Sequence, residues 1–249
     1  MKTCAIIPAA GRGSRLKTNT PKLLSSLTHD QTVWSILRQK LMIVDHIHVV
    51  ASPNGEPLIR QVMQQDISSG FASISVQAEP NGMGDAIFQC YPIWSQAETI
   101  LIVWGDQVFV SEDTFMRSLK THAGVPKTIA LPLSVVTAPY VEYSFDVNSR
   151  LIDIKQSREG DSCAAVGLAD VGTFVLSVSD LLHEWYAYLK QVKQGSRTNE
   201  INFLPFLPFL SANGWRVHRV EVTNPVETRG INTPDDLLFF QNLYENLTL

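Results

Sequence analysis

Residues 4–24 read CAIIPAAGRGSRLKTNTPKLL, an apolar run that ends abruptly in a loop of glycine and basic side chains. The run has the composition of a short buried strand. Glycines let backbone N–H groups approach an anion closely. The chain carries five basic residues and no acidic one before Asp30, which favours an anion-binding loop over a solvated loop with incidental charges.

The loop follows neither of the two common phosphate-binding patterns. Gly11 and Gly13 fit the start of the dinucleotide pattern GxGxxG, but Leu16 stands where the third glycine belongs. The P-loop pattern GxxxxGK[ST] is absent from the sequence. A long loop with basic side chains from Arg15 to Lys22 suits an extended polyphosphate better than a single phosphate.

The bulk composition is that of an ordinary protein with a sizeable core. The 249 residues are 45% hydrophobic and carry a formal net charge of −4. That charge argues against bulk attraction to nucleic acid or to an anionic membrane. Cys4, Cys90 and Cys163 lack the spacing of a zinc site or a disulfide framework, which is typical of buried thiols in a reducing compartment. The first apolar run is too short for a signal peptide or a membrane span, so we expect a cytoplasmic protein without membrane insertion.

Strand-like and helical patterns alternate in the first half of the chain. The strand-like runs are 3–8, 46–51, 72–77 and 99–105, and the helical patterns between them are 31–42, 56–65 and 84–94. This alternation is typical of βαβ units on a largely parallel sheet, which binds ligands at the carboxyl ends of its strands.

Beyond about residue 125, strand-like runs follow one another directly. They are 127–136, 142–147, 151–156 and 170–177, followed by a helical pattern over 179–192 and a last strand over 215–222. Consecutive strands predict antiparallel pieces added to the parallel core. We expect one α/β domain over 1–249 with a Rossmann-like mixed, mostly parallel sheet flanked by helices. Its nucleotide-binding half would span about 1–125 and its acceptor-binding half about 126–249.

The last helix has a clear start signal. Thr233 stands at the N-cap position, Pro234 at the first helical position, and Asp236 completes a pattern close to a capping box. Asn232, just before the cap, has no local role in this pattern.

The loop and three later segments together resemble the sugar-phosphate nucleotidylyltransferases. AAGRGSR followed by TPKLL matches the signature GxGxRxxxxxPK of that family, with the same spacing from Gly11 to Lys22. VQAEPNGMGDAI resembles its nucleobase and ribose segment, VWGDQVF its strand with a GD motif, and VETRGINTPDDL its closing segment. The resemblance covers about residues 3–240 and includes the uridylyltransferase domain of N-acetylglucosamine-1-phosphate uridylyltransferases.

The resemblance implies a fold of the nucleotide-diphospho-sugar transferase type and a Mg²⁺-dependent reaction. A sugar 1-phosphate, or a similar phosphomonoester, would attack the α-phosphate of an NTP to give an NDP-sugar and pyrophosphate. Arg15 would hold the departing phosphates, and Lys22 would bridge the α-phosphate and the acceptor phosphate. Asp106 and Asn232 would bind Mg²⁺, for which a carboxylate at the end of a buried strand is a suitable hard ligand. The alternatives are a turn-forming Asp106 and an Asn232 that binds only local backbone.

The resemblance also implies which residues bind the nucleotide and which bind the acceptor. The nucleotide-binding residues would be Ala9, Ala10, Gly11, Gly13, Gln77 and Gly82. Gln77 can serve uracil, thymine or cytosine by rotating its amide, and Asp85 is interpreted as the favourable charge at a helix start. The acceptor-binding residues would be Ser144, Gln156 and Asp170. They replace a Gly, a Glu and an Asn of the uridylyltransferases, which speaks against N-acetylglucosamine 1-phosphate as the acceptor.

Other functions remain open at this stage. A cytidylyltransferase acting on phosphocholine-like acceptors would use the same motifs. A glycosyltransferase on a similar sheet would usually show a DxD metal motif, whereas this chain has GDQV. A sensor that binds nucleotide sugars without turnover would not need Arg15, Lys22, Asp106 and Asn232 together. The sequence does not select the nucleobase or the acceptor, and it leaves open a homo-oligomer.

Overall fold

The first strand forms where the apolar run predicts it. The computed structural model describes residues 2–11, 16, 20–192 and 194–247. β1, Thr3–Ala9, lies inside a ten-stranded sheet, and Cys4 to Ile7 are completely buried. The other strands are β2 His46–Ala51, β3 Ala72–Val76, β4 Thr99–Val103, β5 Thr128–Thr137, β6 Val141–Phe145, β7 Leu151–Gln156, β8 Val166–Asp170, β9 Thr173–Ser177 and β10 Arg216–Glu221.

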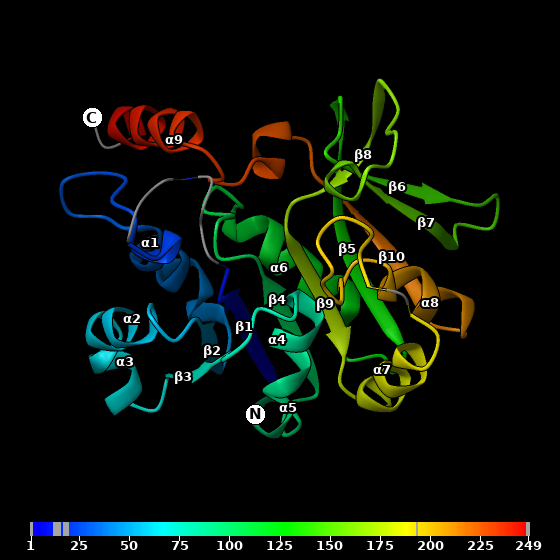
Figure 1. Cartoon of the computed structure of the whole chain (residues 1–249), viewed down its shortest axis with the longest axis horizontal. Helices are drawn as coiled ribbons and strands as arrows, with labels where there is room; N and C mark the ends of the chain where they lie inside the picture. The colour runs from blue at the N-terminus through cyan, green and yellow to red at the C-terminus, as the bar shows by residue number, and fades with distance from the viewer. Residues whose placement is uncertain (1, 12–15, 17–19, 193, 248–249) are drawn as a thin grey trace.

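The sheet is mixed, and a single sheet runs through both halves of the chain. Its strand order is β3-β2-β1-β4-β9-β5-β8-β6-β7, with β10 paired to β5 (Figure 1). The first four strands pair in parallel. β9 then joins β4 in the antiparallel sense, and β6, β7 and β8 form an antiparallel extension. This architecture confirms the predicted Rossmann-like fold class.

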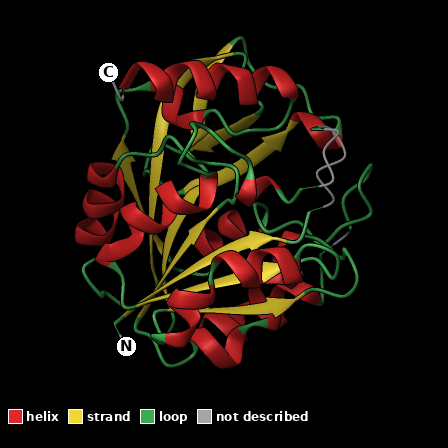
Figure 2. Ribbon diagram, turned by 90° about the vertical axis from the view of Figure 1, so that its left-hand side faces the viewer, coloured by secondary structure: helices red, strands yellow, loops and turns green. Residues whose placement is uncertain are grey.

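Helices cover both faces of the sheet, as Figure 2 shows. They are α1 Val33–Lys40, α2 Glu56–Val62, α3 Gln64–Ser68, α4 Met83–Gln89, α5 Tyr91–Trp94, α6 Glu112–His122, α7 Leu181–Leu189, α8 Phe206–Ala212 and α9 Pro234–Leu247. Short 3-10 turns are η1 Lys22–Leu24, η2 Leu41–Ile43, η3 Ser157–Glu159 and η4 Pro225–Thr228. In the described part of the chain, no helix has both the length and the apolar character that a membrane crossing requires.

Successive side chains of β1 belong to two separate cores, one on each face of the sheet. Ala5 and Ile7 join a cluster with α1, α2, α6 and α9, whereas Cys4 and Ile6 join another with α4, α5, α7 and α8. Side chains of a strand point alternately to opposite faces, so a strand that is apolar at every position must be covered on both sides. Because both faces of the strand are covered, polar groups that bind a ligand must lie at the ends of the strands.

One strand prediction was wrong in its boundaries. The run predicted over 170–177 is the end of β8 joined to β9, because the chain turns at Gly172 between them. Gly172 has a φ of 68°, which glycine adopts readily, and its N–H donates to Asp170 Oδ1 at 2.6 Å. The prediction also left α6 unassigned, although Ser111 caps it by accepting from the Thr114 N–H.

Candidate active site

Three predicted residues that are far apart in the sequence meet at the carboxyl edge of the sheet. Lys22 Nζ donates to Asp106 Oδ2 at 3.2 Å and to Asn232 Oδ1 at 3.0 Å. The side chains of Lys22 and Asp106 are 22% and 19% exposed, so a ligand can still reach them. We call these three residues the phosphate side of the site.

Asp106 reaches this position because it follows β4, which runs parallel to β1. The segment that leads into α9 packs behind it. The Ile231 N–H donates to the main-chain oxygen of Asp106 at 2.9 Å. A Cβ on Gly230 would lie 3.2 Å from the Asp106 carboxylate, so glycine allows this close contact. The loop of Asp106 and the loop of Asn232 are therefore held together.

The cap of α9 positions Asn232. Asp236 Oδ2 accepts from the N–H groups of Asn232 and Thr233 and from Thr233 Oγ1. The Asp236 N–H in turn donates to Thr233 Oγ1 at 3.2 Å, as the capping pattern predicts. Burial raises the pKa of Asp236, but hydrogen bonds from Thr233 and Arg229 outweigh it and hold the pKa below its usual value. The cap that starts the helix also fixes the backbone of Asn232.

Lys40 supports the loop after Asp106 from the opposite direction. Its Nζ donates to the carbonyls of Val108 and Val110 at 2.8 and 2.9 Å and to the Tyr244 hydroxyl at 3.4 Å. Burial lowers the pKa of Lys40 to about 8, although Glu227 and Glu112 raise it. Lys40 thus ties α1 to this loop and to α9. It went unrecognised in the sequence because it stands at the end of an ordinary amphipathic helix.

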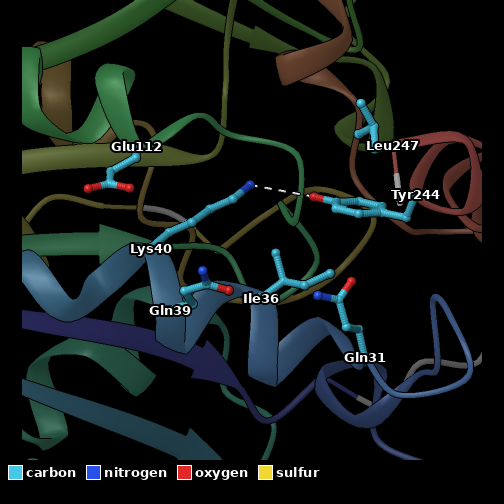
Figure 3. Close-up of a pocket in the computed structure, with 7 residues that line it drawn as sticks. All are labelled: Gln31, Ile36, Gln39, Lys40, Glu112, Tyr244 and Leu247. Atoms are coloured by element: carbon cyan, nitrogen blue, oxygen red, sulfur yellow. Dashed lines mark hydrogen bonds between the residues drawn. The ribbon is translucent and has the colours of Figure 1, made fainter. Parts of the chain in front are cut away.

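Lys40 and Tyr244 also line the pocket drawn in Figure 3. The pocket measures about 310 Å³ and lies among α1, α6 and α9. None of the predicted site residues lines it. The pocket is therefore separate from the candidate active site.

The nucleotide-binding assignments begin at the end of β1. Ala9 is half-buried and Ala10 is buried, whereas Gly11 is exposed. Among the described residues other than its chain neighbours, none has an atom within 4 Å of a Cβ built on Gly11, so these residues leave that position open to a ligand. Gly13 and Arg15 lie outside the described residues, and their assigned roles remain predictions.

Gln77 and Gly82 lie in direct contact. Gln77 Nε2 donates to the Gly82 carbonyl at 3.0 Å and to Asp85 Oδ2 at 2.7 Å. Gly82 has a φ of 112°, and a Cβ there would lie 2.7 Å from the Ile201 carbonyl oxygen. This position therefore requires glycine. Asp85, interpreted from the sequence as a helix-start charge, is bound to Gln77.

The acceptor-side residues, defined as Ser144, Gln156 and Asp170, share no hydrogen bond among their side chains. Asp170 is buried, and its carboxylate accepts from the Tyr143 hydroxyl at 2.9 Å and from the Gly172 N–H. Burial raises the pKa of Asp170, while those hydrogen bonds lower it; the net change is upward. Ser144 is half-buried on β6, opposite Asp153 of β7, and Gln156 is buried at the end of β7. Their acceptor-binding role remains a prediction.

A segment that the sequence motifs did not point to links the acceptor side to Gly82. The Glu159 carboxylate accepts from Thr198 Oγ1 at 2.7 Å and from Asn202 Nδ2 at 3.1 Å. Burial would raise the pKa of Glu159, but these hydrogen bonds lower it to about 2. At its other end, the Ile201 carbonyl accepts from the Gly84 N–H at 3.2 Å. Residues 195–202 therefore run between the loop after β7 and the start of α4.

Comparison with known proteins identifies the family of the chain. The sequence profile of the MobA-like NTP transferase domain matches residues 5–192. The chain belongs to this family of NTP transferases. The recognition of a nucleotidyltransferase family from the loop, the GD motif and the closing segment is thereby confirmed.

Individual relatives of the MobA-like domain are distant in sequence. The chain is 24% identical to the bifunctional protein GlmU of Ruthia magnifica subsp. Calyptogena magnifica over 243 residues, which are 97% of the chain and 51% of that protein. It is 24% identical to the corresponding protein of Blochmanniella pennsylvanica (strain BPEN), with 97% of the chain and 52% of that protein covered. The chain thus spans about half the length of the curated relatives it matches.

A solved structure shows the same fold. It is assigned to a glucose-1-phosphate thymidylyltransferase from Bacillus anthracis in complex with sucrose. The two chains superpose with a TM-score of 0.75 and 16% sequence identity, covering 97% of this chain and 94% of the other. At this identity the likeness establishes the fold and leaves the substrates open.

The donor set of the phosphate side fits a hard divalent cation. A carboxylate oxygen of Asp106 and an amide oxygen of Asn232 face the same positive charge, that of Lys22. Mg²⁺ takes few protein ligands and completes its shell with phosphate oxygens and water. Within the residues described, no group of three or more His, Cys, Asp or Glu side chains could hold a metal ion.

Proposed function

We propose that this protein is a Mg²⁺-dependent sugar-phosphate nucleotidylyltransferase. The observation that carries the proposal is the meeting of Lys22, Asp106 and Asn232 at the carboxyl edge of the sheet. The family membership of residues 5–192 supports it. The GlmU relatives and the thymidylyltransferase structure support an acceptor that is a sugar 1-phosphate or a similar phosphomonoester.

The reaction would be an in-line displacement at phosphorus. An oxygen of the acceptor phosphate forms a bond to the α-phosphorus of the NTP, and the bond from that phosphorus to the β-phosphate oxygen breaks. Pyrophosphate leaves with the electron pair, and the acceptor becomes part of a new diphosphate. A phosphomonoester oxygen is already ionised near neutral pH, so no general base is needed. Catalysis then rests on positioning and on stabilising negative charge.

Each residue has a defined part in this proposal. The Lys22 ammonium would leave its two oxygen partners and bind the α-phosphate and the acceptor phosphate. The loop at Gly11 would offer backbone N–H groups to the nucleotide, and Arg15 would hold the departing phosphates. Asp106 and Asn232 would hold Mg²⁺, which when bound neutralises charge on phosphate oxygens. The metal would then take the place of Lys22 beside the Asp106 and Asn232 oxygens and supply the positive charge there.

Pyrophosphate release tests the proposal. Each of the four common NTPs, and dTTP, is combined with pools of hexose, hexosamine and pentose 1-phosphates and with phosphocholine, in the presence of Mg²⁺. We expect release with one NTP and one acceptor pool, together with a product that contains the acceptor and the nucleoside monophosphate. Release of a nucleoside diphosphate instead would identify a glycosyltransferase. Nucleotide binding without turnover by any combination would favour a sensor.

A further inference from the structure

A single carboxylate organises residues 195–202, which we call the bridging segment. Glu159 ends the short turn η3, which follows β7 directly, and its side chain is only 9% exposed. Its Oε1 accepts from Thr198 Oγ1 at 2.7 Å and from Asn202 Nδ2 at 3.1 Å, and its Oε2 accepts from the Arg197 N–H at 3.1 Å. Hydrogen bonds to a carboxylate are stronger than those between neutral groups, so Glu159 holds the bridging segment against the loop after β7.

The bridging segment also folds back on itself. The Gly195 N–H donates to the Glu200 carbonyl at 2.9 Å, and the Asn199 N–H donates to the Gly195 carbonyl at 2.9 Å. The Thr198 hydroxyl, which donates to Glu159, accepts from the Glu200 N–H at 3.3 Å. This hydroxyl therefore joins the Glu159 carboxylate to the turn that carries Glu200.

The far end of the bridging segment is bound to the predicted nucleotide side. The Ile201 N–H donates to the Asn81 carbonyl at 2.8 Å, and the Ile201 carbonyl accepts from the Gly84 N–H at 3.2 Å. These main-chain bonds lie on both sides of Gly82. A Cβ on Gly82 would lie 2.9 Å from the Glu200 Cβ, so the two backbones are in close contact. A displacement of the bridging segment therefore displaces the loop of Gly82 as well.

An ion pair joins the same two parts of the molecule. Arg158 Nη2 donates to Glu200 Oε2 at 2.6 Å, and the two side chains are 28% and 32% exposed. Arg158 lies in η3, just after the predicted acceptor residue Gln156, whereas Glu200 lies against Gly82. A partly exposed ion pair adds little to the stability of a fold. It can still fix the position of η3 relative to Gly82.

We propose that Glu159 is a positioning residue that couples the binding of the two substrates. Through the bridging segment, a nucleotide bound beside Gly82 would set the position of the loop after β7, where the acceptor binds. The inference rests on the proposed function, because it takes Gly82 to lie beside the nucleotide and Gln156 beside the acceptor. Coupling between two sites is reciprocal, so each substrate should raise the affinity for the other by the same factor.

The test measures the binding of each substrate with and without the other by isothermal titration calorimetry in the presence of Mg²⁺. The nucleotide probes are the α,β-methylene analogues of ATP, CTP, GTP, UTP and dTTP, which cannot transfer the nucleotidyl group. The acceptor probes are glucose 1-phosphate, N-acetylglucosamine 1-phosphate and phosphocholine. We call the ratio of the two Kd values of one substrate, without and with the other, the coupling factor.

Two variants each remove one contact of the bridging segment. Glu159→Gln keeps the shape of the side chain but replaces one accepting oxygen by an NH₂ group, which cannot accept. Thr198→Val keeps the volume of the side chain and removes the hydroxyl that donates to Glu159. Thr198→Ser retains that hydroxyl and is the conservative variant. Thr28→Val, which removes a hydroxyl that donates to Asp30 Oδ1 at 2.8 Å, is the matched control.

We expect a coupling factor of about ten or more in wild type, and a factor below about three in Glu159→Gln and Thr198→Val. The Kd of the nucleotide analogue alone should change little in these two variants. Thr198→Ser and Thr28→Val should keep the wild-type factor. A purely structural role of Glu159 would instead weaken the binding of each substrate alone and leave the coupling factor unchanged.

Independent binding of the two substrates in wild type, or an unchanged factor in Glu159→Gln and Thr198→Val, would overturn the inference. Pyrophosphate release from the natural NTP would still support the proposed function in that case. Coupled binding without pyrophosphate release from any NTP would support the inference and count against the proposed function. Failure of every nucleotide analogue to bind, or of every acceptor probe under both conditions, would overturn both.

Discussion

The phosphate side and the acceptor side use their polar groups in opposite ways. On the phosphate side, Lys22, Asp106 and Asn232 come from three separate segments and hydrogen-bond to one another, while Lys22 and Asp106 stay partly exposed. On the acceptor side, the Asp170 carboxylate is buried and already bound to Tyr143 and Gly172. The first arrangement can exchange its internal partners for a charged ligand, whereas the second holds two strands together.

The difference has a physical origin. A triphosphate presents the same charges whatever the acceptor, so the groups that bind it are constrained to a few residue types at the strand ends. Acceptors vary in shape, and the residues predicted to bind the acceptor lie on an antiparallel extension of the sheet. Function is therefore easier to infer from Lys22 and Asp106 than from Ser144 or Gln156.

The largest loss of activity should come from substitutions on the phosphate side. Lys22→Ala and Asp106→Ala should each lower kcat/KM by about 100-fold to 1,000-fold. The first removes the positive charge proposed to bind the reacting phosphates, and the second removes a proposed ligand of Mg²⁺. The melting temperature should stay nearly unchanged, since a partly exposed ion pair contributes little to stability. Steady-state pyrophosphate release and thermal unfolding measure the two effects.

Lys120→Ala, at an exposed position of α6, is the control and should keep full activity. Full activity in Lys22→Ala or Asp106→Ala would remove that residue from the mechanism.

Removing the support of Asn232 should have the next largest effect. Asp236→Ala takes away the acceptor that holds the Asn232 and Thr233 N–H groups. We expect kcat/KM to fall about 10-fold to 100-fold, as for other groups that orient a ligand-binding side chain. The loss of the cap should lower the unfolding free energy by about 1 kcal/mol. Asp235→Ala, exposed on the same turn, is the control, and equal losses in the two variants would contradict the positioning role.

A substitution on the acceptor side should lower the stability of the fold more than it changes nucleotide binding. Tyr143→Phe leaves the buried Asp170 carboxylate with only the Gly172 N–H. The unfolding free energy should fall by about 1–3 kcal/mol, the usual cost of an unsatisfied buried group. Urea unfolding gives this value, and NTP titration should give an unchanged Kd. A large rise in the NTP Kd with unchanged stability would erase the distinction between the two sides.

The smallest expected effect is a pH dependence from Lys40. Its folded pKa of about 8 lies below its ordinary value of 10.5. Between these pH values the unfolded chain binds more protons than the folded one, so the Lys40 contribution makes the unfolding free energy rise with pH. Urea unfolding at pH 8 and pH 10 should show a smaller rise in Lys40→Met than in wild type. If the unfolding free energy rose equally with pH in both proteins, burial would not lower the pKa of Lys40.

The sequence predicted the parts of the molecule that local patterns determine. Short local patterns predict β1 and the cap at Thr233. Motifs of a few residues each also single out Lys22, Asp106 and Asn232. The Asp170–Tyr143 contact depends on how β6 pairs with β8, where Tyr143 stands opposite Leu168. No local pattern fixes that pairing.

The remaining surprises also depend on long-range packing. The Gln77–Asp85 contact lies next to Gly82, where the Ile201 carbonyl of a distant segment leaves no room for a Cβ. Lys40 gains its role only when the loop after Asp106 and α9 have both folded against α1. The sequence contains these residues, but their partners are set by tertiary structure.

Asp106 and Asn232 should together hold a divalent cation beside a bound nucleotide. Electron paramagnetic resonance of Mn²⁺ in the presence of a non-hydrolysable NTP measures this directly in wild type, Asp106→Ala and Asn232→Ala. We expect nucleotide-dependent binding of Mn²⁺ in wild type and an affinity at least about tenfold weaker in either variant. Equal Mn²⁺ binding by all three proteins would contradict it.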